Sequence, residues 1–427
     1  MTATIDLLDF AAAEHRLSGS VRSDTMRLLA DTLAVGVAGV SAPGAEGVFK
    51  TASTWGAGSE ARILGRQTRL PAASAAYVNA FQIHCLEWDA VHEPAVVHAL
   101  SVVTAALLAA VDRKPGCTKD EILAALAVGV DVASGLGIAA DTGLSFFRPA
   151  TAGLIGAAMA VARIAGLPRA QFDDVLGLGY SHCAGTMQAH VEGSIALPLQ
   201  IANAARAAIH VVDLVSNGLT GPHDALEGPF GYFTLFDQGE LSRYTATLGQ
   251  TWLIGQVSTK PYPSGRASHA ALGALAGFSS TNISRIEAFV PPLVKRLVGR
   301  PFDPGMTPAY ARLCLPLLAA LMLKDGVVDP RRFAPAAFAD DDVRAIASRL
   351  TITLDDNQDP NALFPQRVIV TLDDGTSHEI AIPSAPGSPD AALSSTQISS
   401  KYALCRTLAG DCDPRIFDDP LSYVMES

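Results

Sequence analysis

The sequence predicts a mainly α-helical protein with a large all-α domain and a smaller α+β domain. Small and apolar residues recur at helical spacing over most of the chain up to about residue 255. Beyond that point, segments rich in Ile, Val and Thr alternate polar and apolar residues, as strands do. Hydrophobic residues make up 49% of the 427 residues and aromatic residues only 6%, which favours helices packed through small side chains. A chain of this length is expected to form two domains.

The all-α domain is predicted to span residues 1–258 and to be completed by residues 395–427. An amphipathic helix opens the chain, and SDTMRLLADTLAVGVAGV predicts a second helix that begins at Ser23 or Asp24. Two apolar helices are expected on either side of Pro94, which cannot continue a helix. Thr118 and Glu121 have the spacing of a capping box, which marks the start of the next long helix.

The smaller α+β domain is predicted for residues 259–394, inserted before the C-terminal helix. Three segments are expected to contain strands: ISRIEAFVPPLV, RLTITLDDN and QRVIVTLDDGTSHEIAIP. The last of them contains Asp373-Asp374-Gly375-Thr376, which predicts a hairpin turn. Residues 307–323 predict a helix, and residues 384–394 a linker back to the first domain.

Charge and composition exclude several classes of partner. A net charge of −11 argues against nucleic acid as a partner. No stretch of about 18 apolar residues runs without a polar interruption, so no membrane span is predicted.

The N-terminus lacks the pattern of a signal peptide, and the six cysteines are scattered, so a cytoplasmic protein with free thiols is expected. The high apolar content predicts a homodimer, because so much apolar surface has to be covered.

The stretch from Asn79 to Ser101 concentrates ionisable residues in a chain with only 17% charged residues. His84 and Glu87 share one face of a helix, Asp89 follows, and His98 falls at the start of the next helix. We interpret this stretch as a buried polar pocket; a solvated loop is the alternative. His and carboxylate are metal-ligand types, but the H-E-x-x-H signature is absent, so no metal is predicted.

Two further stretches carry cations. Arg148 precedes Pro149 at a helix start, where it is a candidate anion clamp. The segment KPYPSGRASH contains Lys260, Arg266 and His269 at the predicted domain junction, a common place for ligand sites. Cations and carboxylates together suit a substrate with carboxylate groups and chemistry based on proton transfer. Dinucleotide-binding, P-loop and serine-hydrolase motifs are absent.

These stretches resemble the motifs of the MmgE/PrpD family over about residues 5–415. Asn79 and His84 match the family's first signature, Glu87 stands at the place of its first active-site aspartate, and Asp89 matches the next acid. His98 and Ser101 fit the following H-P-S element if one residue is inserted. Two later motifs also match: the loop from Gly221 to Gly231, and Lys260 to Ser264 with His269 in the place of the family's active-site histidine.

The family includes 2-methylcitrate dehydratases, cis-aconitate decarboxylases and an iminodisuccinate epimerase. The resemblance therefore implies a homodimeric lyase or isomerase without a cofactor, which removes a proton beside a carboxylate of a small acid. On this basis we predict His98 and His269 as acid and base, with Glu87 orienting one of them. The residues predicted to contact substrate are Arg148, Lys260, Arg266, Asp89 and His84. His84 is also expected to pack its helix, so that His84→Ala would mainly destabilise the fold.

Three departures from the family pattern bear on the substrate. Leu197 stands where the family has a lysine, Leu317 where it has a tyrosine, and Phe147 or Arg148 where it has a histidine. Leucine makes a drier pocket, so we expect a substrate with fewer carboxylates than 2-methylcitrate, or a more apolar one. The alternative is a relative that binds a metabolite without turning it over.

Overall fold

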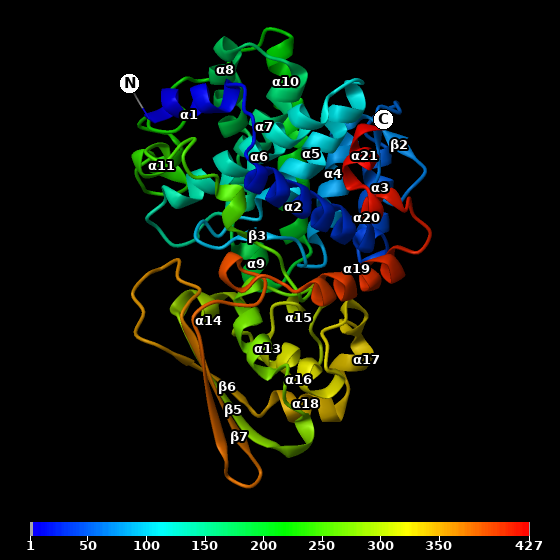
Figure 1. Ribbon diagram of the computed structural model, residues 1–427, viewed down its shortest axis with the longest axis vertical. Helices are drawn as coiled ribbons and strands as arrows, with labels where there is room; N and C mark the ends of the chain where they lie inside the picture. The colour runs from blue at the N-terminus through cyan, green and yellow to red at the C-terminus, as the bar shows by residue number, and fades with distance from the viewer. Residues whose placement is uncertain (1–2, 427) are drawn as a thin grey trace.

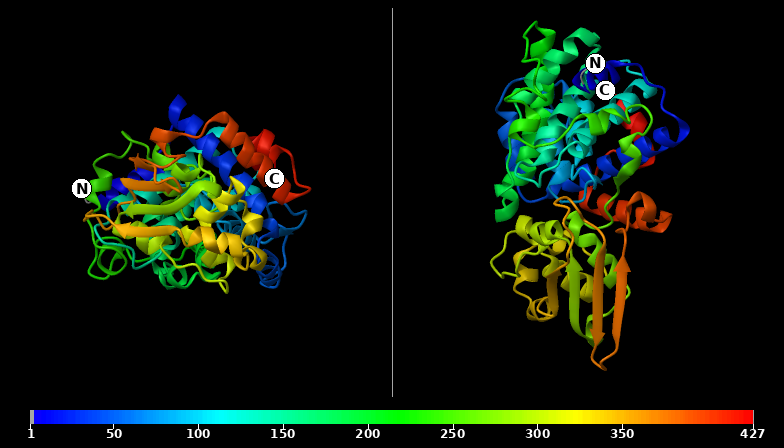
Figure 2. Two further views of the ribbon diagram at one scale, coloured as in Figure 1. Left: turned by 90° about the horizontal axis from the view of Figure 1, so that it is seen from below. Right: turned by 90° about the vertical axis from the view of Figure 1, so that its left-hand side faces the viewer.

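A computed structural model describes residues 3–426 of the chain. It confirms a mainly helical fold with a small mixed sheet in the C-terminal part. Figure 1 shows a large helical body at one end of the long axis and the sheet with its helices at the other. Both termini lie in the helical body, since the red C-terminal segment returns to the blue N-terminal helices (Figures 1 and 2). The exact domain boundaries stay a prediction.

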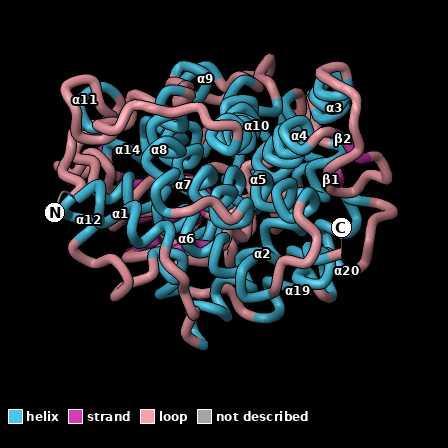
Figure 3. Tube along the Cα trace, turned by 90° about the horizontal axis from the view of Figure 1, so that it is seen from above, coloured by secondary structure: helices cyan, strands magenta, loops and turns pink. Residues whose placement is uncertain are grey.

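The centre of the helical body is a bundle of five helices, α4, α5, α6, α7 and α10, which pack against one another (Figure 3). Shorter helices and α2 surround it. The helices of this body are α1 Ala3–Ala12, α2 Gly19–Ala38, α3 Ala45–Ser53, α4 Ala72–His84, α5 Ala99–Arg113, α6 Lys119–Ile138, α7 Arg148–Ala165, α8 Phe172–Ser181, α9 Gln188–Glu192, α10 Ala196–Ser216, α11 Tyr232–Leu235 and α12 Ser242–Thr245.

Small residues allow the bundle helices to approach closely, as the composition suggested. A Cβ atom added to Gly156 of α7 would lie 2.2 Å from the carbonyl oxygen of Gly129 in α6. Helix α6 is long and apolar enough to cross a membrane by length and composition. In this structure, however, 89% of its most apolar window is buried, as in the core helix of a globular protein.

Of two helix starts predicted from local sequence signals, one is confirmed and the other is wrong. Thr118 and Glu121 form the predicted capping box at the start of α6. The predicted start of α2 at Ser23 or Asp24 is wrong, because the helix begins at Gly19 and Ser18 caps it. Ser18 accepts a hydrogen bond from the backbone N–H of Val21, which gives the helix one extra turn.

The small sheet has the strand order β6-β5-β7-β8, with β5 and β6 parallel and the other pairs antiparallel. All predicted strands are present, and Gly375 takes the positive φ that the hairpin turn requires. The strands are β5 Ile283–Val290, β6 Leu350–Leu354, β7 Gln366–Leu372 and β8 Ser377–Ile382. The helices beside them are α13 His269–Leu275, α14 Pro292–Val298, α15 Pro308–Ala311, α16 Leu315–Asp325, α17 Pro335–Phe338 and α18 Asp341–Ala347.

Two connections join the helical body to the sheet region. The short strand β3 Val91–His92 pairs antiparallel with β4 Val257–Ser258, which brings the ionisable stretch against the start of the second region. After the sheet, α19 Ser395–Ala409 packs against α2, followed by α20 Arg415–Asp418 and α21 Pro420–Met425. The 2.6 Å ion pair between buried Lys401 of α19 and buried Asp31 of α2 strengthens this return. Two further pairs of residues, Ala61–Arg62 (β1) and Arg69–Leu70 (β2), form a minimal ladder.

Candidate functional site

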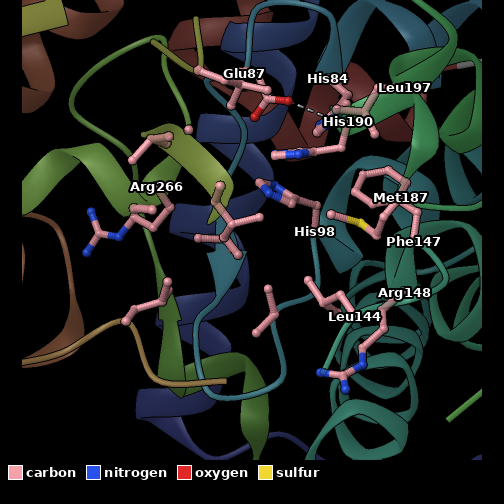
Figure 4. Close-up of a pocket in the computed structure, with 18 residues that line it drawn as sticks. His84, Glu87, His98, Leu144, Phe147, Arg148, Met187, His190, Leu197 and Arg266 are labelled. Carbon is pink, nitrogen blue, oxygen red and sulfur yellow. Dashed lines mark ion pairs between the residues drawn. The ribbon is translucent and has the colours of Figure 1, made fainter. Parts of the chain in front are cut away.

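A small cavity lies where the end of α4, the start of α5 and the loop after β4 meet. Its volume is about 60 Å³, which favours a small ligand. Its walls are mostly apolar, with a few ionisable groups, as ligand sites usually are. Figure 4 shows the lining side chains around the central space. The lining includes His84, Glu87, Val91, Val96, His98, Leu144, Phe147, Arg148, Met187, His190, Leu197, Arg266, Leu297, Val298, Leu313 and Leu363.

Asp89 connects two of the histidines that line this cavity, His84 and His98. His84, the last residue of α4, approaches both carboxylate oxygens of Asp89 with Nδ1 at 3.0 Å. His98, the N-cap of α5, approaches Asp89 Oδ2 with its own Nδ1 at 3.1 Å. The two imidazole rings are 5.0 Å apart and nearly perpendicular. A single buried carboxylate therefore orients two histidines that both face the cavity.

The surroundings push the pKa values of these histidines apart. Burial alone would lower the pKa of His84, but the negative charges of Asp89 and Glu87 outweigh it and raise the pKa to about 9. For His98, burial prevails over the attraction of Asp89, and Lys260 adds to it, so the pKa is lowered. Burial alone would raise the pKa values of Glu87 and Asp89, but the combined attraction of His84 with Lys260 for Glu87, and of His84 with His98 for Asp89, outweighs it and lowers both. Near pH 7.5 the site therefore contains a charged His84 and a neutral His98.

Glu87 is held between the two regions of the protein. Its carboxylate lies 3.3 Å from His84 Nε2 and 3.3 Å from Lys260 Nζ, and Lys260 also donates to the Glu87 carbonyl at 2.9 Å. Glu87 and Val96 are the non-glycine residues with positive φ within residues 3–426, at 54° and 52°. Both line the cavity. Such strained backbone clusters at functional sites, where surrounding contacts enforce it.

Arg148 and Arg266 line the cavity but do not present free charges to it. Arg148 is fully buried and bonds both carboxylate oxygens of Asp237 at 3.1 Å. Arg266 bonds Glu93 through Nε at 2.9 Å and Nη2 at 2.7 Å. Both guanidinium groups point away from His98 (Figure 4). Internal carboxylates thus already neutralise both arginines, and their contact with a substrate stays a prediction. Lys260 is likewise bound to Glu87.

His269 does not line this cavity. It is fully buried, its Nε2 lies 3.2 Å from the Ser264 hydroxyl, and Arg266 Nη1 lies 3.4 Å from its Nδ1. Burial, followed by the charges of Arg266 and Lys260, lowers its pKa well below the usual range. His98 and His269 therefore do not open into one cavity, and the predicted acid–base pair across a shared space is not what the structure shows. His269 instead supports the segment that carries Arg266.

The ligand atoms of His84, Asp89 and His98 all lie within 4.8 Å of one another, which is close enough for a metal ion. The sequence argued against a metal, and the hydrogen bonds from both Nδ1 atoms to Asp89 account for the same closeness. Two histidines and one carboxylate nevertheless form a donor set that divalent transition metals accept. These three residues would hold a metal ion, were one to bind here.

Sequence reasoning missed two buried arginines, Arg300 and Arg312, and did not include His190 among the candidate site residues. His190 lines the cavity, and burial followed by the charge of Arg300 lowers its pKa to about 4. Arg312 sits in the apolar run Ala311–Leu318, and no motif marks it. Leu197 lines the cavity as its place in the family motif suggested, whereas Leu317 is buried and is not among the lining residues.

The fold and the site define a two-region helical protein with a buried acid–base cavity between its regions. The sequence matches the MmgE/PrpD N-terminal domain over residues 8–244 and the MmgE/PrpD C-terminal domain over residues 262–414. The chain therefore belongs to the MmgE/PrpD family.

Three curated relatives span most of the chain at low identity. Cis-aconitate decarboxylase of Homo sapiens is 26% identical over 397 residues, which is 86% of this chain and 81% of the relative. The Mus musculus enzyme of the same name is 25% identical, over 85% of this chain and 78% of its own length. A cis-aconitate decarboxylase-like protein of Aspergillus oryzae is 25% identical, over 88% and 84%. The distant relatives are thus lyases of carboxylic acids.

Proposed function

We propose that this protein is a cofactor-independent lyase or isomerase that removes a proton beside a carboxylate of a small carboxylic acid. The observation that carries the proposal is the histidine pair on Asp89, with one member neutral and the other charged. Two titratable groups whose surroundings push their pKa values apart provide a base and an acid at the same pH. The names of the relatives, which are carboxylic-acid decarboxylases, support a small carboxylate as substrate.

His98 is the base in this proposal. Its Nδ1 is engaged by Asp89, and its ring lines the cavity, so Nε2 is the nitrogen available to a substrate. Nε2 takes the proton from the carbon next to the carboxylate, and the electron pair of the C–H bond spreads into that carboxylate. Asp89 stabilises the imidazolium that forms.

His84 supplies the acid. Its positive charge stabilises the negative charge that develops on the substrate, and Glu87 holds its ring in place. The electron pair then either expels a leaving group, which departs with a proton from His84, or takes a proton back at carbon. The first outcome is a lyase reaction and the second an isomerisation. Both balance without an oxidant, a reductant or a cofactor.

Proton exchange tests the proposal without knowledge of the natural reaction. Candidate acids are incubated with the protein in D₂O, and loss of the C–H signal next to the carboxylate is followed by NMR. We expect wild-type protein to exchange at least one acid, and His98→Gln to slow that exchange by about 10² or more. His223→Gln is the control, because that side chain is 70% exposed and remote from the cavity. Unchanged exchange in His98→Gln would refute the role of His98. Binding without exchange in wild-type protein would instead favour the metabolite-binding alternative.

A further inference from the structure

Formal charges around the cavity balance except at two arginines. His84 and Lys260 face Glu87 and Asp89, so these four charges cancel. The ion pairs of Arg148 with Asp237 and of Arg266 with Glu93 are also internally neutral. Arg300 and Arg312 remain. Within residues 3–426, neither of them forms an ion pair with an acidic side chain.

Arg312 is the more deeply buried of the two, with 2% of its surface exposed. Its Nε has no hydrogen-bond partner in the described part of the chain, and its guanidinium stacks 5.3 Å from the centre of the Phe333 ring. A buried charge without a partner is costly, and burial accordingly lowers the pKa of Arg312. A ligand of opposite charge would offset this cost by forming charge-assisted hydrogen bonds with the guanidinium.

Arg312 lines a second, smaller cavity beside the first. This cavity has a volume of about 10 Å³, room for about one water molecule or one oxygen atom of similar size. Its lining shares His84, Glu87, Leu197 and Leu313 with the larger cavity. A molecule that reacts beside His98 and His84 is therefore separated from Arg312 only by the side chains that line both cavities.

Arg300 adds a second positive charge on the same side. It is 8% exposed and donates through Nη2 to the carbonyl of His190, while its Nη1 has no hydrogen-bond partner within residues 3–426. Nη1 lies next to Gly193, where an added Cβ would be 2.8 Å away, and Gly193 lines the smaller cavity. The two unpaired cations thus flank one small space.

We propose that Arg312, assisted by Arg300, binds a second carboxylate of the substrate, so that the substrate is a small dicarboxylate. This inference rests on the proposed function for the reacting end of the molecule. One carboxylate and its neighbouring carbon lie beside His98 and His84. The other carboxylate reaches past Leu197 and Leu313 to Arg312, whose planar guanidinium suits bidentate recognition. Arg312 is a specificity-determining residue in this arrangement.

A binding assay tests the subsite without turnover. Succinate, maleate and glutarate are each titrated calorimetrically against the monocarboxylate of the same chain length. Wild-type protein should bind at least one dicarboxylate at least about tenfold more tightly than its monocarboxylate, as expected for a hydrogen bond to a charged group. Arg312→Met should lose this preference, Arg312→Lys should keep part of it, and Arg344→Met, an exposed arginine of α18, should keep all of it.

Thermal unfolding of the unliganded proteins separates a binding role from a structural one. Arg312→Met removes an unpaired buried charge, so its melting temperature without ligand should equal or exceed that of wild-type protein. A lower melting temperature would show that Arg312 holds the fold, and would overturn the proposal. So would a dicarboxylate preference that survives Arg312→Met, or its absence in wild-type protein. If the preference depends on Arg312 but no acid exchanges protons, the chemistry proposed for His98 fails and the subsite stands.

Discussion

The charge of His84 should appear as a pH-dependent part of the protein's stability. In the folded protein its pKa is about 9, against 6.5 for an ordinary histidine, because Asp89 and Glu87 outweigh burial. Folding therefore strengthens proton binding at His84. A raised pKa contributes stability that is fully present below pH 6.5 and is lost as the pH rises through about 9.

The size of this contribution follows from the shift. One pKa unit corresponds to about 1.4 kcal/mol, so the rise from 6.5 to about 9 corresponds to about 3 kcal/mol. His84→Gln removes the titrating group and keeps a polar side chain of similar reach. The free energy of unfolding of wild-type protein minus that of His84→Gln should therefore fall by about 3 kcal/mol between pH 6.5 and 9. Other groups whose pKa values are the same in both proteins cancel in this difference.

Urea unfolding at a series of pH values measures the difference, and His92→Gln provides a matched control. Burial lowers the pKa of His92 to about 4, so its contribution is present above pH 6.5 and is lost as the pH falls towards 4. The His92 difference should be flat above pH 6.5, where the His84 difference changes most. A flat His84 difference between pH 6.5 and 9 would mean that His84 is not charged in the folded protein. The proposed acid would then be wrong.

Four further outcomes are expected. The rate of proton exchange should have a bell-shaped pH profile, with an acid limb below pH 6.5 from His98 and an alkaline limb near pH 9 from His84; an alkaline limb that is absent contradicts the assignment. Gly39→Ala should destabilise the fold by about 1–3 kcal/mol in urea unfolding, because its Cβ would lie 2.0 Å from the Gln82 carbonyl. Gly47→Ala, exposed on α3 with open space around it, should stabilise by about 0.5–1 kcal/mol. Light scattering should return twice the mass of one 44.4 kDa chain; the mass of a single chain excludes the homodimer.

The sequence predicted the fold well because its signals are local and agree with one another. Period-two alternation located β5 to β8, the Asp-Asp-Gly-Thr turn located their hairpin, and Thr118 with Glu121 located the start of α6. The start of α2 was misplaced because Ser18 and Ser23 are equally good caps by residue type. Which of them caps the helix depends on where the chain packs, and a local pattern does not contain that information.

For the site, the sequence identified the ionisable segment, but it could not show which acidic residue pairs with which arginine. It found the concentration of charge from His84 to His98, because six histidine and acidic residues stand out there in an apolar chain. It could not show that Asp237 and Glu93 neutralise Arg148 and Arg266, since Asp237 is 89 residues from its arginine and Glu93 is 173 from its own. Arg312 was missed because its distinguishing feature is the lack of an ion-pair partner within residues 3–426. Only the three-dimensional arrangement reveals this lack.

The backbone strain at Glu87 and Val96 connects these observations. Neither residue type favours a positive φ, and each such residue costs about 1–3 kcal/mol. Contacts enforce both conformations. The Glu87 N–H donates to the His84 carbonyl and Lys260 holds its side chain, while the Val96 N–H donates to the Glu93 carbonyl. These two bends flank the segment in which Asp89 lies between His84 and His98, and they place both imidazoles on one carboxylate. A chain with negative φ at Glu87 and Val96 would contain the same residues, but it would not bring both imidazoles to one carboxylate. The strain is thus best explained as the means by which the fold holds a neutral His98 and a charged His84 with their rings 5.0 Å apart.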